Sequence, residues 1–132
     1  MRTSVPTENP WGYVVGYSRA VRSGNLIFVS GTTASGPDGK ALFPGESGPQ
    51  ARVILERIEA ALTKLGASLK HVIETRIYLC DMNQWEAVGR VHGAFFGAIR
   101  PAATMVEVSR LIASGLMVEI SVTAVVDADT VS

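Results

Sequence analysis

Two hydrophobic periodicities follow one another along the chain, and their order constrains the fold more than any other feature. Apolar residues recur every three to four positions at 49–65 and again at 83–99, which predicts two amphipathic helices. Alternating or β-branched segments predict five strands, at 17–21, 26–30, 72–80, 103–109 and 117–125. Because a helix with one apolar face must cover a partner layer, we predict an α+β fold in which a single mixed β-sheet carries two helices packed on one face.

Turn-forming residues mark the predicted ends of these elements. Gly24 stands between the first two strands at the spacing of a hairpin. The segment 31–48 contains five glycines and two prolines, so we expect a long surface loop, and such loops often border binding sites. Gly66 suits the left-handed position after the first helix, and Asn83 with Glu86 predicts a capping box at the start of the second.

Composition narrows the class of protein. Of the 132 residues, 47% are hydrophobic and 18% charged, so we expect a single domain, 1–132, with its own core. Twelve basic residues balance twelve acidic ones, which predicts no positive surface for a nucleic acid or an anionic membrane. Cys80 is the single cysteine, which excludes an intrachain disulfide and a zinc cluster; we predict no metal and a reducing compartment.

The first ten residues lack the pattern of a secretion signal. They include two prolines and have neither a basic start nor an apolar run, and no later apolar run reaches the ~20 residues of a membrane span. We therefore expect an irregular beginning to the chain and a cytoplasmic protein.

One face of the predicted sheet is left uncovered. Strand alternation assigns to it a mixture of charged, polar and apolar side chains, namely Arg76, Tyr78, Met105, Glu107, Glu119, Ser121 and Thr123. A surface of this kind is seldom left to solvent in a monomer, and no remaining segment is available to cover it. The pattern therefore predicts self-association without fixing the number of subunits.

Seven short segments occur in a recognisable order along the chain, at 17–21, 27–31, 50–52, 95–96, 101–102, 106–108 and 118–120. They read YSRAV, IFVSG, QAR, FF, PA, VEV and VEI. In this order and spacing the sequence resembles the Rid/YjgF/UK114 family of reactive-intermediate imine deaminases. The resemblance implies a fold like that of the small, bacillus-type chorismate mutase. It also implies a homotrimer whose sheets face inward, with ligand clefts between the subunits.

The resemblance implies a reaction as well. In deaminating members, an arginine two residues after a proline holds the substrate carboxylate, and a glutamate on the last strand helps to activate the water that hydrolyses an imine. Glu119 matches that glutamate, whereas Ala103 stands at the position of the arginine. Gly89 and Thr32 replace an asparagine and a glutamine of the family pattern. The chain thus resembles a divergent member that lacks the substrate-binding arginine.

Three further candidates follow from the resemblance. Tyr17, Ser30 and Gly31 match positions that line the family cleft, where a phenol can stack or hydrogen-bond and backbone amides can hold a carboxylate. The alternative for all three is ordinary hairpin structure.

Strand alternation offers a replacement for the missing arginine. It predicts that Arg76 shares a face with Ala103 and Glu119, where its guanidinium could bind the substrate. Met105 is predicted on that face too and is counted among the ligand contacts. The alternative is that Arg76 or Glu119 forms an ion pair at a subunit interface. His92 is a candidate for acid–base or ligand-binding chemistry, although a lone helix histidine beside two phenylalanines favours packing in the core.

These features lead to one main hypothesis and two rivals. The first is a Rid-like hydrolase that adds water to an imine or enamine and releases ammonia at an intersubunit cleft, without a cofactor. The missing arginine predicts weak action on simple 2-imino acids. The alternative is a non-catalytic trimer that binds a small metabolite. An endoribonuclease-type activity is third, because the neutral chain carries no basic patch.

Overall fold

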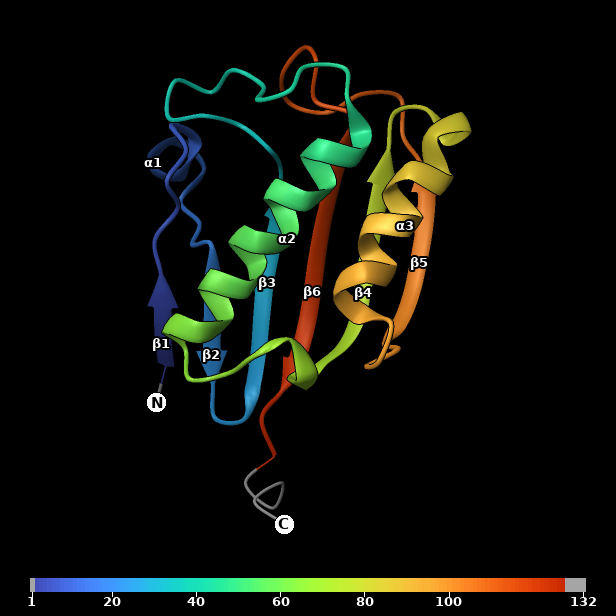
Figure 1. Ribbon diagram of the computed structural model, residues 1–132. Coiled ribbons are helices and arrows are strands. Elements are labelled where there is room, and N and C mark those ends of the chain that lie inside the picture. The colour runs from blue at the N-terminus through green and yellow to red at the C-terminus, as the bar shows by residue number, and fades with distance from the viewer. Residues whose placement is uncertain (1, 128–132) are drawn as a thin grey trace.

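A mixed β-sheet extends across the protein behind the two long helices (Figure 1). The computed structural model describes residues 2–127. In spatial order the six strands are β1 (Arg2–Val5), β2 (Ala20–Ser23), β3 (Leu26–Thr32), β6 (Val118–Val125), β4 (Val72–Leu79) and β5 (Ala102–Glu107). β4 and β5 run parallel, whereas the other neighbouring pairs of this sheet run antiparallel. The prediction of a single mixed sheet is confirmed.

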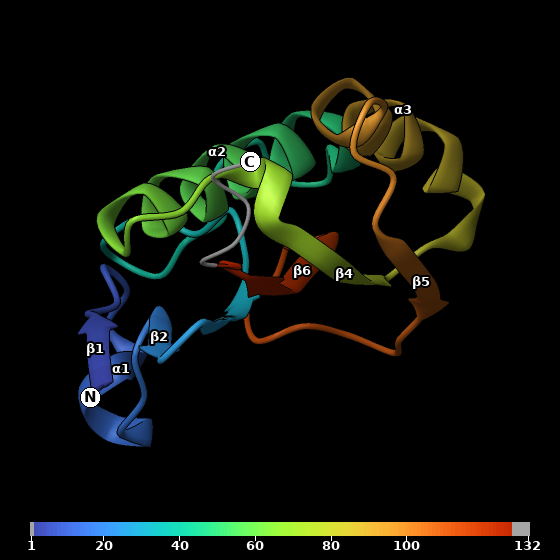
Figure 2. The ribbon, with the colours of Figure 1, turned by 90° about the horizontal axis from the view of Figure 1, so that it is seen from below.

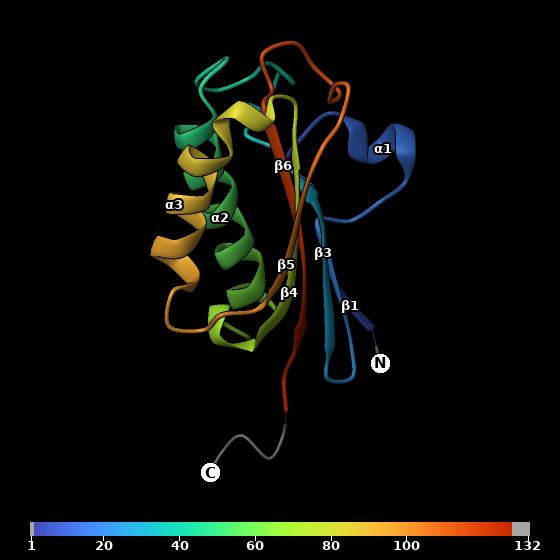
Figure 3. The ribbon, with the colours of Figure 1, turned by 90° about the vertical axis from the view of Figure 1, so that its right-hand side faces the viewer.

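Two long helices, α2 (Ser47–Lys64) and α3 (Trp85–Phe96), form one layer on one face of the sheet (Figures 2 and 3). Short 3₁₀ helices, η1 (Leu69–His71) and η2 (Met82–Gln84), lead into β4 and α3. A third helix, α1 (Trp11–Val15), lies on the opposite side of the sheet (Figure 3). The predicted α+β arrangement with two helices on one face is therefore confirmed, and α1 is an addition to it.

The core lies between the two long helices and the sheet. Along one face of α2, four large apolar side chains are fully buried: Ile54, Leu55, Ile58 and Leu62. Every second residue of β6 is buried against them: Val118, Ile120, Val122 and Ala124. Burial of each large aliphatic side chain contributes about 1.5–3 kcal/mol, so the match between the two periodicities fixes which sheet face the helices cover.

Local signals at the element ends are largely confirmed. Ser23 pairs with Leu26 across a two-residue turn in which Gly24 has a φ of +62°. Gly66 follows α2 with a φ of +80°, a conformation that favours glycine. The capping box predicted at Asn83 is wrong, because the side chain of Asp81 accepts the hydrogen bond from the Asn83 amide.

Two long-range pairings differ from the predictions. The beginning of the chain is not irregular, because β1 pairs along its whole length with β2. In β4, unbroken alternation from Ile77 would turn Ile73 toward the core, but Ile73 is 51% exposed. The pairing between β4 and β6 shifts between Val72 and Glu74, so the alternation changes phase there and Val72 is buried in place of Ile73.

Candidate functional site

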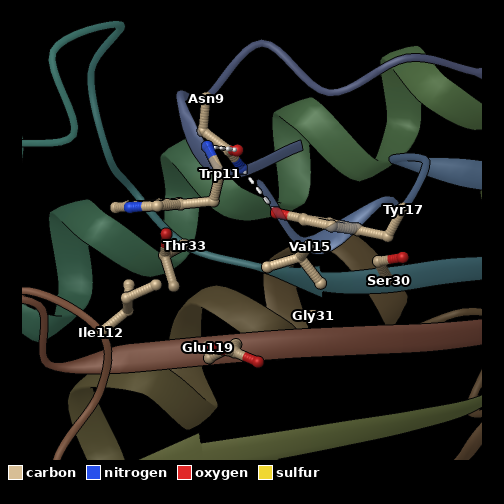
Figure 4. Close-up of a pocket in the computed structure, with 9 residues that line it drawn as sticks. All are labelled: Asn9, Trp11, Val15, Tyr17, Ser30, Gly31, Thr33, Ile112 and Glu119. Atoms are coloured by element: carbon tan, nitrogen blue, oxygen red, sulfur yellow. Dashed lines mark hydrogen bonds between the residues drawn. The ribbon is translucent and has the colours of Figure 1, made fainter. Parts of the chain in front are cut away.

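A cavity of about 280 Å³ opens where β3, β6 and α1 meet, on the side of the sheet away from α2 and α3 (Figure 4). Its walls are formed by residues distant in sequence: Asn9, Trp11, Val15, Tyr17, Ser30, Gly31, Thr33, Ile112 and Glu119. The structure thus brings together four of the predicted candidates, namely Tyr17, Ser30, Gly31 and Glu119.

A β-bulge in β3 shapes one wall of this cavity. Ser30 and Gly31 together stand opposite a single β6 residue, Ser121, where the pairing between the two strands shifts. A bulge bends its strand and re-aims the neighbouring side chains. Ser30 donates its hydroxyl hydrogen to the carbonyl oxygen of Ser18 at 2.8 Å, which leaves the oxygen lone pairs of Ser30 available to a ligand.

Glu119 lies against the bulge. A Cβ atom added to Gly31 would overlap the Oε2 atom of Glu119, so the carboxylate occupies space that only a glycine at position 31 leaves open. The pairing of Glu119 with Tyr78 of β4 places it on the open face, between the buried residues Val118 and Ile120. The lack of a side chain at Gly31 therefore allows a partly buried carboxylate beside the cavity.

The position of Glu119 changes its acidity. Burial raises the pKa of the Glu119 carboxyl group, and the nearby positive charge of Arg19 offsets part of that rise. A raised pKa makes the Glu119 carboxylate a stronger proton acceptor than an exposed carboxylate, which suits a general base.

Arg19 is the residue of this region that the sequence analysis did not single out. It is only 3% exposed, and its Nη1 atom donates to the Gly31 carbonyl oxygen at 3.1 Å and to Thr32 Oγ1 at 3.0 Å. Its Nε atom pairs with Glu8 Oε1 at 3.4 Å. Arg19 therefore stabilises the bulge, and the Thr32 hydroxyl oxygen serves as one of its two acceptors there. The available signal was a charged residue within the predicted strand 17–21.

Tyr17 connects the cavity to α1. The Nδ2 atom of Asn9 donates to the Tyr17 hydroxyl at 2.9 Å, and the Oδ1 atom of Asn9 accepts from the Trp11 amide at 3.0 Å (Figure 4). These bonds fix the start of α1, whose Trp11 and Val15 line the cavity. The side chain of Trp11 lies in the cavity wall (Figure 4).

Gln50 secures the two loops that border the cavity. Its side chain is fully buried, and its Nε2 atom donates to the carbonyl oxygens of Leu42, Phe43 and Gly115 at 3.2, 2.9 and 2.8 Å. Its Oε1 atom accepts from the Met117 amide at 2.8 Å. The loop after β3 and the loop between β5 and β6 are therefore fastened to the same helix residue.

Arg76 lies on the open face but is engaged by its own neighbours. Its Nε, Nη1 and Nη2 atoms donate to Ser121 Oγ at 3.0 Å, Glu74 Oε1 at 2.8 Å and Thr123 Oγ1 at 3.2 Å. Neither cavity that Glu119 lines includes Arg76. The ion pair between Arg76 and Glu74 is formed within one chain.

The predicted placement of Ala103 and Met105 on the face of Glu119 is wrong. In the parallel pair of β4 and β5, Ala103 lies beside Thr75 and Met105 beside Ile77, and both partners face the helices. Met105 packs against the core cluster. Glu107 is on the helix side too, where its carboxylate accepts from the amide of Met82 in η2. Alternation within β5 shows which of its residues share a face. Which of those faces meets the helices depends on the pairing of β5 with β4.

His92 is also separated from Glu119 by the sheet. It projects from α3, its Nε2 atom is 2.9 Å from Thr75 Oγ1, and its ring centroid is 4.7 Å from that of Phe96. Burial lowers the pKa of the His92 imidazole, which favours the neutral ring. Its surroundings are those of a packed helix residue.

Two further findings concern residues 2–127 alone. No group of three or more histidine, cysteine, aspartate or glutamate side chains lies close enough together to hold a metal ion in this part of the chain. Within the same range, none of the helices has the length and apolar character needed to traverse a bilayer.

Comparison with known proteins identifies the family. Residues 8–126 match the family described as endoribonuclease L-PSP. The chain belongs to the Rid/YjgF/UK114 family. A solved Mycobacterium tuberculosis member of this family, Rv2704, is 48% identical, with a TM-score of 0.86 over 96% of this chain and 100% of that one. The RutC family protein PH0854 of Pyrococcus horikoshii is 37% identical over 84% of this chain and 88% of its own length.

A third Rid/YjgF/UK114 relative was solved with a small molecule. The structure of E. coli TdcF with bound serine is 28% identical to this chain, with a TM-score of 0.75 over 84% of this chain and 88% of that one. The serine belongs to that protein. It shows that a relative of this fold binds an amino acid.

Proposed function

We propose that this protein hydrolyses an imine or enamine of a small metabolite, with Glu119 as the residue that activates water. The observation that carries the proposal is the partly buried Glu119 carboxyl group, whose pKa is raised, on a cavity wall opened by Gly31. General acid–base catalysis requires such a group near the reacting atoms. No cofactor takes part in the proposed reaction.

The proposed reaction has two stages. In the first, Glu119 accepts a proton from water as the water oxygen bonds to the imine carbon, and solvent supplies a proton to the imine nitrogen to give a carbinolamine. In the second, the carbon–nitrogen bond breaks, the protonated Glu119 gives its proton to the departing nitrogen, and the hydroxyl proton of the carbinolamine passes to solvent, which leaves ammonia and a carbonyl product. An enamine enters the same sequence after protonation of its carbon. Tyr17 and Ser30 position the substrate through the phenol and the free lone pairs of the serine hydroxyl.

A homotrimer is part of the proposal. The open face of the sheet exposes apolar side chains, including Phe28 at 51% and Val106 at 41%, on the same side as Glu119. Surfaces of this kind favour association with another copy. Packing of these faces around a threefold axis would turn the open cavity into a cleft between subunits, with less access for bulk water.

The decisive experiment measures imine hydrolysis directly. An amino acid oxidase with catalase generates imines from L-alanine, L-leucine and L-phenylalanine, and semicarbazide competes with hydrolysis for each imine. The wild-type protein should lower the semicarbazone yield in proportion to its concentration. The effect should be weakest for the alanine-derived imine, whose methyl group makes the least contact with Trp11 and Val15 in the cavity wall. A protein that leaves every yield unchanged is not a hydrolase of these imines.

The alternative is a trimer that binds a small metabolite without turnover. It is favoured by Ala103 and by the serine held in E. coli TdcF. Calorimetric binding of a metabolite by wild type and Glu119→Gln alike, with no hydrolysis by either, is the result expected from that function.

A further inference from the structure

A second cavity, of about 240 Å³, adjoins the first. Both cavities are lined by Gly31 and Glu119, so the carboxylate stands between two chambers of one cleft. The second chamber is completed mainly by β4 and by the loop between β5 and β6, which contributes Arg110 and Leu111. A ligand beside Glu119 can therefore extend in two directions.

Both chambers carry polar and apolar side chains, but they differ in bulk and in charge. The first has the bulky apolar side chains of Trp11, Val15 and Ile112 beside its polar residues. The second has a cationic residue, Arg110, beside Val108 and Leu111. A ligand can therefore place a bulky apolar part in the first chamber and an acidic group in the second.

Arg110 differs from the other two arginines of this region in having its donors free. Arg19 is committed to Gly31, Thr32 and Glu8, and Arg76 to Glu74, Ser121 and Thr123, as described above. Within residues 2–127, the guanidinium of Arg110 forms neither a hydrogen bond nor an ion pair, and its side chain is exposed. An unengaged planar cation can form two parallel hydrogen bonds with a carboxylate.

The loop that carries Arg110 is held at both ends. The Val108 amide donates to the Leu79 carbonyl oxygen at 2.7 Å where the loop begins. Buried Gln50 holds Gly115 and Met117 where it ends. Arg110 is thus presented to the chamber from a fastened loop, which reduces the loss of chain entropy when a ligand binds.

We infer that Arg110 is the anion-binding residue of the cleft and receives the acidic group of a ligand whose apolar part occupies the chamber of Trp11, Val15 and Ile112. The binding role of Arg110 is independent of the proposed function. Only the reaction that follows binding, at the carbon held beside Glu119, rests on that function. The inference names the substrate class as imines of amino acids with bulky apolar side chains, carrying the carboxylate toward Arg110. An alanine-derived imine would leave the space beside Trp11, Val15 and Ile112 unfilled.

Binding is the first test, because it does not depend on turnover. The probes are 2-oxo-4-methylpentanoate and its amide, which share one apolar part and differ in charge. Arg110→Gln should weaken binding of the acid by roughly tenfold or more and leave binding of the amide unchanged, whereas Arg110→Lys should retain part of the affinity. Arg90→Gln is the matched control, since Arg90 pairs with Glu86 on the surface of α3.

The outcomes separate this inference from the proposed function. Equal loss of acid and amide binding, no loss of either, or no binding of the acid by wild type would each overturn the role of Arg110. Charge-selective loss of binding in a protein that hydrolyses no imine would support the anion site while refuting the hydrolase. In an active protein, Arg110→Gln should raise KM for the leucine-derived imine more than it lowers kcat. An unchanged KM would refute the anion site at Arg110 but would be consistent with the proposed hydrolase activity.

Discussion

The carboxylate of Glu119 lies directly against the α-carbon of Gly31, in a volume that any side chain at position 31 would occupy. The contact joins the bulge of β3 to the residue proposed to activate water. This contact explains how Ser30 and Gly31 act together with Glu119, although they are distant in the sequence.

Gly31→Ala should therefore displace Glu119. The added methyl group overpacks the contact, and overpacking in a well-packed region typically destabilises by about 1–3 kcal/mol. Imine hydrolysis should fall more than stability accounts for, because the carboxylate is no longer aimed at the cavity. Chemical denaturation and semicarbazide competition measure the two effects.

Gly93→Ala provides the matched control for that substitution. Nothing lies within 4 Å of a Cβ atom placed at Gly93, which is in the interior of α3. Alanine should stabilise this helix by about 0.5–1 kcal/mol without changing turnover. Equal behaviour of the two variants would contradict the role assigned to the contact between Gly31 and Glu119.

Glu119→Gln should remove turnover while leaving ligand binding in place. Glutamine keeps the size of the side chain but cannot take a proton from water, and loss of a general base typically lowers the rate by about 10²–10⁴-fold. The measurement is kcat for the leucine-derived imine beside calorimetric binding of 2-oxo-4-methylpentanoate. Glu86→Gln, on the exposed surface of α3, should behave as wild type. Full turnover by Glu119→Gln would refute the proposed reaction.

The stability of the folded protein should depend on pH through Glu119. Its pKa is raised in the folded state by burial, so the folded state retains the proton to higher pH than the unfolded chain does. Below the ordinary value of 4.5, both states are protonated and Glu119 adds no pH dependence. As the pH rises from there through the raised folded value, the unfolded carboxyl group ionises first, and wild type loses stability relative to Glu119→Gln.

Denaturation of the wild type and Glu119→Gln over pH 4–8 at one protein concentration tests this sign. As the pH rises, the unfolding free energy of the wild type should fall relative to that of Glu119→Gln, and the difference between the two should then become constant. A shift in favour of wild type with rising pH would show that pairing with Arg19 outweighs burial in setting the pKa.

Arg19→Met should loosen the bulge. The change leaves the Gly31 carbonyl oxygen and Thr32 without their buried donor, and an unsatisfied buried acceptor costs about 1–3 kcal/mol. Loss of the positive charge should also raise the pKa of Glu119 further, since Arg19 now lowers it. The pH at which kcat/KM rises should therefore move upward, which loss of packing alone would not produce. Arg90→Met, measured in the same way, controls for removal of a surface arginine.

Much of the fold could be predicted because its signals are local. The buried face of α2, the hairpin turn at Gly24 and the end of α2 at Gly66 each depend on residues within a few positions of one another. A helix repeats every 3.6 residues and a strand every two, so hydrophobic side chains reveal the buried face wherever one face is fully covered. Tyr17, Ser30, Gly31 and Glu119 were found through the family resemblance and meet in one cavity.

The sequence by itself determined the order of α2, α3 and strands β2–β6 and the covered face of β6, because burial imposes a strong local pattern there, whereas β1 and α1 emerged only in the structure. Only the tertiary structure decided that Ala103 faces the helices, since the phase of an edge strand depends on its pairing with β4. The same holds for the bulge that seats Glu119 against Gly31 and for Arg110 beside it. Those positions depend on contacts between segments far apart in the chain, which no local periodicity encodes.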